Sequence, residues 1–147
     1  MGLTTRNVVL LALAAFGGRV PGKTLLQKRI YFVAEILGID LGYDAHYYGP
    51  YSDEVASAVV QLRSSGLLRE EQTHYGAKRS GFEIKRYDYE LTDSGRQAIE
   101  MLKQHYPAEV ERIENAASRV DKVASDLDYM ELSIAAKAHW KIGRAHV

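Results

Sequence analysis

The stretch GGRVPGKT, from Gly17 to Thr24, fits G-x-x-x-x-G-K-[ST], the pattern of loops that hold nucleotide phosphates. Such a loop follows a buried strand and offers its backbone N–H groups to the phosphates. Here the preceding segment is rich in Ala and Leu, which favour a helix, and Pro21 has no N–H to donate. The acid that would hold magnesium should end a later strand, but the candidate Asp40 follows Thr24 too closely. We therefore predict a turn between two helices at this stretch.

Other catalytic patterns are also missing from the sequence. Cysteine is absent, and neither G-x-S-x-G nor a dinucleotide-binding fingerprint occurs. Four of the five histidines are scattered, without the spacing of metal ligands: His46, His74, His105 and His139. We therefore predict a non-enzymatic protein with no catalytic residues, no metal site and no cofactor.

Composition limits the classes of protein that remain. The 147 residues are 46% hydrophobic and 26% charged, which is ordinary for one globular domain. No apolar run reaches the roughly 18 residues that cross a bilayer, so we predict a cytoplasmic protein with no membrane partner. The last seven residues, KIGRAHV, resemble a translated sequencing adapter, and we predict that residues 141–147 are a non-native tail. Without Lys141 and Arg144, 17 basic residues face 19 acidic ones, a net charge of −2.

Hydrophobic periodicity predicts an α+β, mainly helical fold. Helices are expected over Thr5–Phe16, over Thr24–Leu37 with a capping box at Thr24 and Gln27, and from Ser52 to Gly66. The core side of the second is Leu26, Ile30, Val33, Ala34 and Leu37, which leaves Gln27, Lys28, Tyr31 and Glu35 on the other side. A hairpin follows over 67–91, with a bulge near Lys85 and Arg86 that reconciles a change of parity. A fourth helix, capped by Thr92 or Ser94, runs to His105, and a last helix covers Tyr129–Trp140.

A long polar helix is expected from Pro107, with a narrow apolar seam at alternating steps of three and four residues. Two interpretations stay open: the seam packs against another helix of the same chain, or it forms a homodimer interface. Its members are Val110, Ile113, Ala117, Val120, Ala124 and Leu127.

Three helices, a hairpin and a further helix follow one another as in a winged-helix domain. The segment YDYELTDSGRQAIEML resembles the second wing strand and following helix of MarR- and PadR-like regulators, with Y-x-L-T-x-x-G-R beginning at Tyr89. The resemblance implies a winged-helix domain over 1–105, with three helices and a two-stranded wing, followed by a C-terminal helical extension over 106–140.

Two segments of the first half carry a second resemblance. LLQKRIYFVAEILG and YYGPYSDE are similar to the L-Q-K-x-x-Y-F and Y-G-P-[FYV]-S signatures of Panacea-type, SocA-like antitoxin domains and their uncharacterised prokaryotic relatives. This resemblance implies a role in prokaryotic regulation or in neutralising a toxin.

Two functions follow as expectations. In the first, the protein is a DNA-associated transcriptional regulator that grips duplex backbone through its wing and second helix, with Lys28, His74, Tyr75, Lys78, Arg79, Lys85 and Arg86. The near-neutral net charge and the acidic start of the third helix predict that this binding is weak and shallow in its salt dependence. In the second, the protein is an antitoxin-like module that docks a partner protein such as a toxin through aromatic anchors of its connector, the Gly/Tyr-rich segment between the second and third helices. These anchors are Tyr43, Tyr47, Tyr48 and Tyr51.

Overall fold

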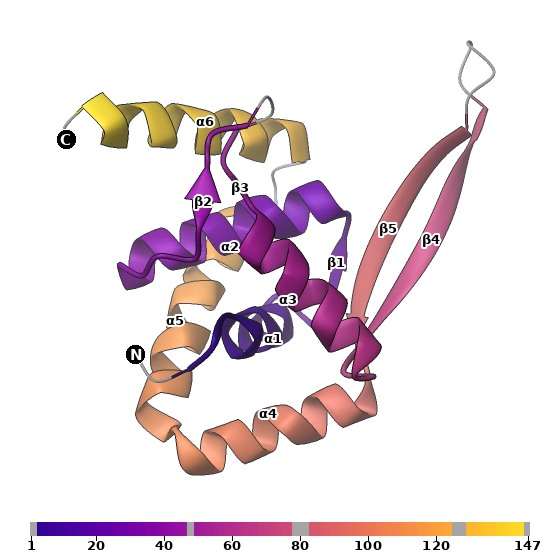
Figure 1. Ribbon diagram of the computed structural model, residues 1–147, viewed down its shortest axis with the longest axis vertical. Coiled ribbons are helices and arrows are strands. Elements are labelled where there is room, and N and C mark those ends of the chain that lie inside the picture. The colour runs from indigo at the N-terminus through magenta and orange to yellow at the C-terminus, as the bar shows by residue number, and fades with distance from the viewer. Residues whose placement is uncertain (1–2, 47–48, 78–82, 125–128, 146–147) are drawn as a thin grey trace.

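Six helices and five short or medium strands make up the described part of the chain in this computed structural model (Figure 1). It describes residues 3–46, 49–77, 83–124 and 129–145, with backbone alone for 73–77, 83–85, 129–130, 133 and 143–145. The elements are α1 Thr5–Ala15, β1 Arg19–Pro21, α2 Lys23–Leu37, β2 Tyr43–Asp44, β3 Tyr51–Ser52, α3 Asp53–Ser64, β4 Leu68–Ala77, β5 Glu83–Leu91, α4 Asp93–His105, α5 Pro107–Ala124 and α6 Tyr129–Ala145. The predicted α+β, mainly helical class is confirmed.

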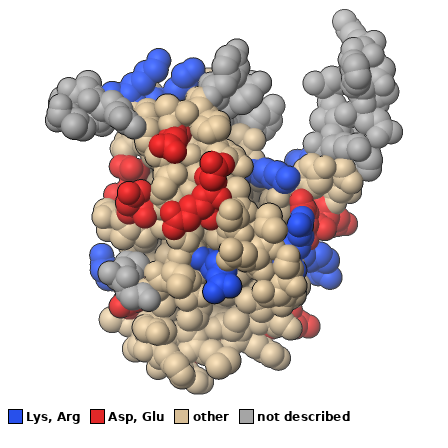
Figure 2. Space-filling view, in the orientation of Figure 1, with Lys and Arg blue, Asp and Glu red and all other residues tan. Residues whose placement is uncertain are grey.

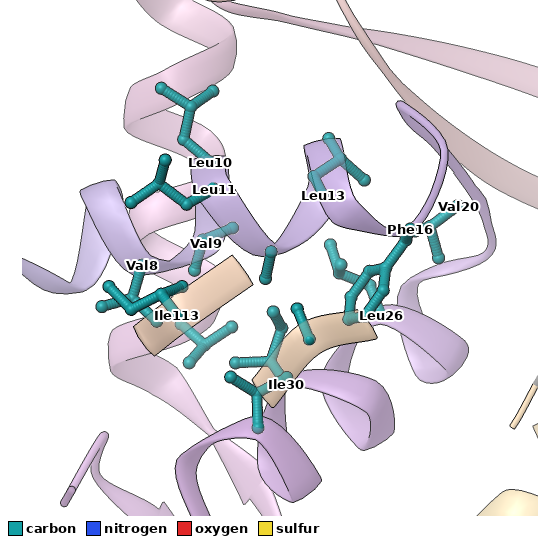
Figure 3. Packing of buried hydrophobic residues seen from close by; sticks show 14 of the residues in the cluster. Val8, Val9, Leu10, Leu11, Leu13, Phe16, Val20, Leu26, Ile30 and Ile113 are labelled. Carbon is teal, nitrogen blue, oxygen red and sulfur yellow. The ribbon is translucent and has the colours of Figure 1, made fainter. Parts of the chain in front are cut away.

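Helix α1 is the centre of the molecule. Thr4 caps its first turn by accepting a hydrogen bond from the backbone N–H of Asn7, at 3.3 Å. The six successive residues from Val8 to Leu13 are all buried, so the helix has no solvent-facing side over this stretch. Figure 3 shows the side chains of α2 and α5 around it. An apolar helix of this kind is expected inside a fold, surrounded by other elements.

The sheet has three antiparallel strands in the order β1-β5-β4. The predicted turn between two helices at 17–24 is therefore wrong in part, because Arg19–Pro21 forms β1 and pairs with β5, Arg19 lying opposite Glu90. The predicted hairpin is confirmed, and in Figure 1 it projects away from the helices. Its register shift lies between His74 and Ala77 of β4, opposite Lys85 and Glu83, so the extra residue is in the strand facing the one predicted.

Helix α2 is enclosed on nearly all sides, which corrects two expectations. It begins at Lys23 after Gly22, which makes no side-chain cap, so the predicted capping box at Thr24 does not form. Every residue from Leu25 to Tyr31 is buried, including the polar side chains that the sequence pattern placed toward solvent. The helix ends at Leu37 as expected, and Gly38 follows in the left-handed conformation with φ of 68°.

The apolar seam of α5 packs inside the chain. Its five described members are buried in the same hydrophobic cluster as α1 and α2, while Leu127 lies outside the described residues. Arg29 of α2 adds an ion pair across this contact, its Nη1 lying 3.5 Å from Asp121 Oδ1. A homodimer through this seam is therefore wrong for these five residues, since their side chains are already covered by helices of the same chain. Residues 1–105 and 106–140, predicted as separate parts, share one core.

Helix α6 lies over α2 and extends past the predicted end at Trp140, through Lys141 and Ile142 to Ala145. Within the described ranges, no helix combines the length and apolar character that a membrane span requires.

Candidate functional site

The two signature segments of the first half bind each other through Gln27 and Ser52. The Gln27 side-chain Nε2 donates to the backbone carbonyl of Ser52 at 2.9 Å, and its Oε1 accepts from the Ser52 N–H at 3.0 Å. Ser52 is fully buried, caps α3 by accepting from the Val55 N–H at 3.0 Å, and donates its hydroxyl proton to the Leu41 carbonyl at 2.5 Å. Gln27 therefore fixes the connector at the residue where α3 begins.

Lys28 fixes the preceding residue of the connector. Its Nζ donates to the Pro50 carbonyl at 2.6 Å, and the residue is 2% exposed. Burial lowers the pKa of Lys28 from its ordinary value. The expectation that Lys28 contacts DNA is therefore wrong, because its ammonium lies inside the fold against a carbonyl and cannot meet a phosphate of a duplex. We name the contacts of Gln27 and Lys28 with residues 50–52 the connector clamp.

The connector tyrosines have different roles. Tyr43 donates its hydroxyl to the Gln27 carbonyl at 2.8 Å and packs edge-on against Tyr31, and burial raises its pKa well above the ordinary value. The Tyr31 hydroxyl in turn lies 2.7 Å from Nδ1 of His139 in α6. Burial is the larger cause and the charge of Glu35 the smaller one that together raise the pKa of Tyr31 to about 12. Tyr43 is thus a packing residue and not a free anchor.

Tyr51 is half-buried, with its ring centroid 4.9 Å from that of the exposed His46. Tyr47 and Tyr48 lie outside the described residues. Of the four predicted anchors, Tyr51 is the one whose described position, beside His46 at the outer end of the clamp, suits contact with a partner.

A cavity of about 550 Å³ opens between α2, α3 and the sheet, next to the connector clamp. Apart from Arg63, the α3 side is apolar, and the α2 and sheet sides are mostly polar. The lining residues are Lys23, Thr24, Leu26, Gln27, Lys28, His46, Gly49, Tyr51, Val55, Ala56, Val59, Val60, Arg63, Glu70 and Tyr89. Its volume lies within the range of small-molecule sites.

Polar side chains at the sheet side of the cavity are largely paired. Arg63 of α3 forms an ion pair with Glu70 of β4, and the Tyr89 hydroxyl donates to Glu70 at 3.4 Å. Burial and the neighbouring Glu70 raise the pKa of Tyr89. Lys23 lies over the ring of Tyr87, with 4.3 Å between Nζ and the ring centroid.

Charge at the base of the hairpin is balanced by ion pairs. Asp88 is buried and binds Arg19 at 3.0 Å and Arg86 at 2.7 Å. Burial raises the pKa of this carboxyl, but the hydrogen bonds from Arg86 and Arg19 outweigh that effect and hold it below its usual value. A further pair joins Arg69 to Glu90 at 3.6 Å.

The structure describes only some of the residues of the hairpin that were predicted to bind DNA. His74, Tyr75 and Lys85 lie on the strands, Arg86 pairs with Asp88, and Lys78 and Arg79 lie outside the described residues. Near the hairpin, Figure 2 shows basic and acidic side chains side by side.

The start of α3 carries negative charge. Asp53 and Glu54 occupy its first turn and are exposed, where they favour the positive end of the helix dipole. In Figure 2 acidic side chains gather on the helical body of the molecule. Like charge repels phosphate, so this end of α3 does not suit the major groove of DNA.

Sequence reasoning missed both the clamp and the cavity. Gln27 and Lys28 were expected on a solvent face, although both belong to the same family signature as YGPYS, and this shared membership was a signal that links the two segments. Among the described residues, no group of three or more His, Asp or Glu side chains is arranged to hold a metal ion.

Fold and site together define an α+β protein, mainly helical, whose second helix clamps the connector to the third. No protein-family model matches the chain. Its sequence is similar to that of the Uncharacterized protein YwgA of Bacillus subtilis (strain 168), with 27% identity over 118 residues, a span that covers 78% of this chain and 68% of the relative.

Proposed function

We propose that this protein is a non-enzymatic winged-helix regulatory module that binds a partner protein, in the manner of antitoxin-type domains. The carrying observation is the connector clamp, which holds the backbone of Pro50 and Ser52 through buried side chains. A connector fixed in this way presents His46 and Tyr51 with little conformational entropy to lose, which favours binding.

The winged-helix assignment is part of the same proposal. Three helices precede the projecting hairpin, Thr92 caps the helix that follows it, and Tyr89 and Leu91 are buried as the wing motif implies. The balanced charges of the hairpin base and the acidic start of α3 favour a protein partner over DNA.

The proposal is tested by co-purification from cells that encode the protein, followed by calorimetry with the two purified components. We expect one stoichiometric partner, and at least tenfold weaker binding for the double variant His46→Ala, Tyr51→Ala. Tyr106→Ala is the control, because Tyr106 is a tyrosine that is 42% exposed but lies at the end of α4, outside the connector. Recovery of no partner, or equal binding by the double variant, would refute the proposal.

DNA binding is the second candidate, favoured by the projection of the hairpin and by its run of basic residues near the turn. A protein that grips the DNA backbone loses affinity as the salt concentration rises, with a slope set by the number of phosphates that it neutralises. The test is titration of duplex DNA at several salt concentrations. This candidate would be supported if the double variant Lys78→Ala, Arg79→Ala binds DNA more weakly and the slope of log affinity against log salt concentration becomes shallower by about two. Lys103→Ala is the control. Binding whose affinity and salt dependence are both unchanged in the double variant would exclude it.

A further inference from the structure

The cavity beside α3 has two chemically different walls. Val55 and Val59 of α3 are buried along one wall, and Ala56 and the 48% exposed Val60 continue it toward solvent. The opposite wall is formed by the first turns of α2, with Lys23, Thr24 and Lys28. A molecule that contacts both walls of the cavity needs an apolar body and a polar group at one end.

Within the part of the chain that the structure describes, the polar wall carries positive charge that no carboxylate balances. Among the described lining residues, Glu70 is the single carboxylate, and it already pairs with Arg63. Lys28 donates to a neutral carbonyl, and no described carboxylate lies within ion-pair distance of it. Burying an ammonium without a counter-charge costs free energy, which an anion beside it would recover.

The start of α2 adds to the positive character of this wall. Gly22 offers no side-chain acceptor to the first N–H groups of the helix, and Lys23 and Thr24 of that first turn line the cavity. Uncapped N–H groups and the helix dipole both favour a negative group at this end. The buried Lys28 and the first turn of α2 therefore both favour a negatively charged group on a ligand.

We propose that this cavity is a binding site for a small organic anion with an apolar body. The anionic group lies against Lys28 and the first turn of α2, and the apolar body lies against Ala56, Val59 and Val60 of α3. Because the cavity borders Tyr51 and His46, its occupant would adjoin the surface that we assign to the partner protein.

The test is calorimetric titration of the full chain with octanoate, octanamide and inorganic phosphate. We expect saturable binding of octanoate, at least tenfold weaker binding of octanamide because it lacks the charge, and weak binding of phosphate because it lacks the apolar body. Equal binding of octanoate and octanamide, or no saturable binding of octanoate, overturns the proposal.

Two variants locate the site. Lys28→Gln removes the charge and should weaken octanoate binding at least tenfold, whereas Lys103→Gln makes the same change in net charge on α4 and should leave binding unchanged. Because Lys28→Gln also loses a bond of the connector clamp, Ala56→Phe provides a second variant that fills the apolar wall without touching the clamp. Retention of full octanoate affinity in Ala56→Phe, with a native circular dichroism spectrum, would overturn the assignment.

Discussion

Replacement of Gln27 by Leu tests whether the connector clamp holds the fold together. Leu keeps most of the buried volume of Gln, so the change isolates the two hydrogen bonds to Ser52, at 2.9 and 3.0 Å. Both the N–H and the carbonyl of Ser52 would be left without these partners in a residue that is fully buried.

The magnitude follows from the number of groups affected. A neutral hydrogen bond contributes a net of about 1 kcal/mol, and an orphaned buried group costs about 1–3 kcal/mol. The Ser52 N–H becomes an orphaned group, whereas the Ser52 carbonyl loses one hydrogen bond but, as the N-cap carbonyl of α3, still accepts from the helix, so the expected loss is about 2–4 kcal/mol in the free energy of unfolding. Because domains of this size are stable by about 5–15 kcal/mol, the loss is large but leaves a folded protein.

The assay is urea unfolding followed by circular dichroism, with Gln61→Leu as the matched control on the exposed side of α3. The control should stay within about 0.5 kcal/mol of the parent protein. Hydrogen exchange gives a local readout, because the Ser52 amide should exchange faster in Gln27→Leu. A change below about 0.5 kcal/mol, or unchanged exchange at Ser52, would refute the role assigned to the clamp.

Three further predictions rest on single contacts. Thr92→Ala removes the α4 cap and should cost about 1–2 kcal/mol in urea unfolding, whereas Thr24→Ala, at a helix start where Thr makes no cap, should cost under about 0.5 kcal/mol. Gly95→Ala places a Cβ 2.3 Å from the Leu67 carbonyl oxygen, and a cost of about 1–3 kcal/mol in the same assay is expected. Asp88→Asn should destabilise the protein at neutral pH, with a difference that narrows as pH falls below about 4, because a depressed carboxyl pKa stabilises the fold above its unfolded pKa and loses that effect as pH falls through its folded pKa. A difference that stays constant with pH would contradict the ion-pair role of Asp88.

Helices and the hairpin could be predicted because their signals are local. Thr92 marks the start of α4 and Gly38 the end of α2, since capping residues and left-handed glycines act within a few residues of the helix end. The buried side chains of α3 can be predicted for the same reason, because Val55, Val59 and Leu62 recur at helical spacing along one face.

Features that depend on distant partners could not be predicted from local pattern. Periodicity assigned Gln27 and Lys28 to solvent because polar side chains usually lie there, yet their partners are 25 and 22 residues further along the chain. The seam of α5 was compatible with packing inside the chain or with a homodimer interface, and only the position of α1 in the fold decides between the two. Strand β1 has three residues and a proline, too little for a recognisable strand signal.

The pairing of Arg19 with Glu90 also limits the order in which the chain can fold during its synthesis. During synthesis β1 leaves the ribosome long before β5. The two strands therefore cannot pair until the residues between them, about half of the chain, have been translated. The enclosed α1 must wait longer still, until α5 has been translated and can cover it. A nascent chain that stalls before Val110 would therefore leave the α5-facing side of α1 exposed, and such chains should be substrates for chaperones and proteases.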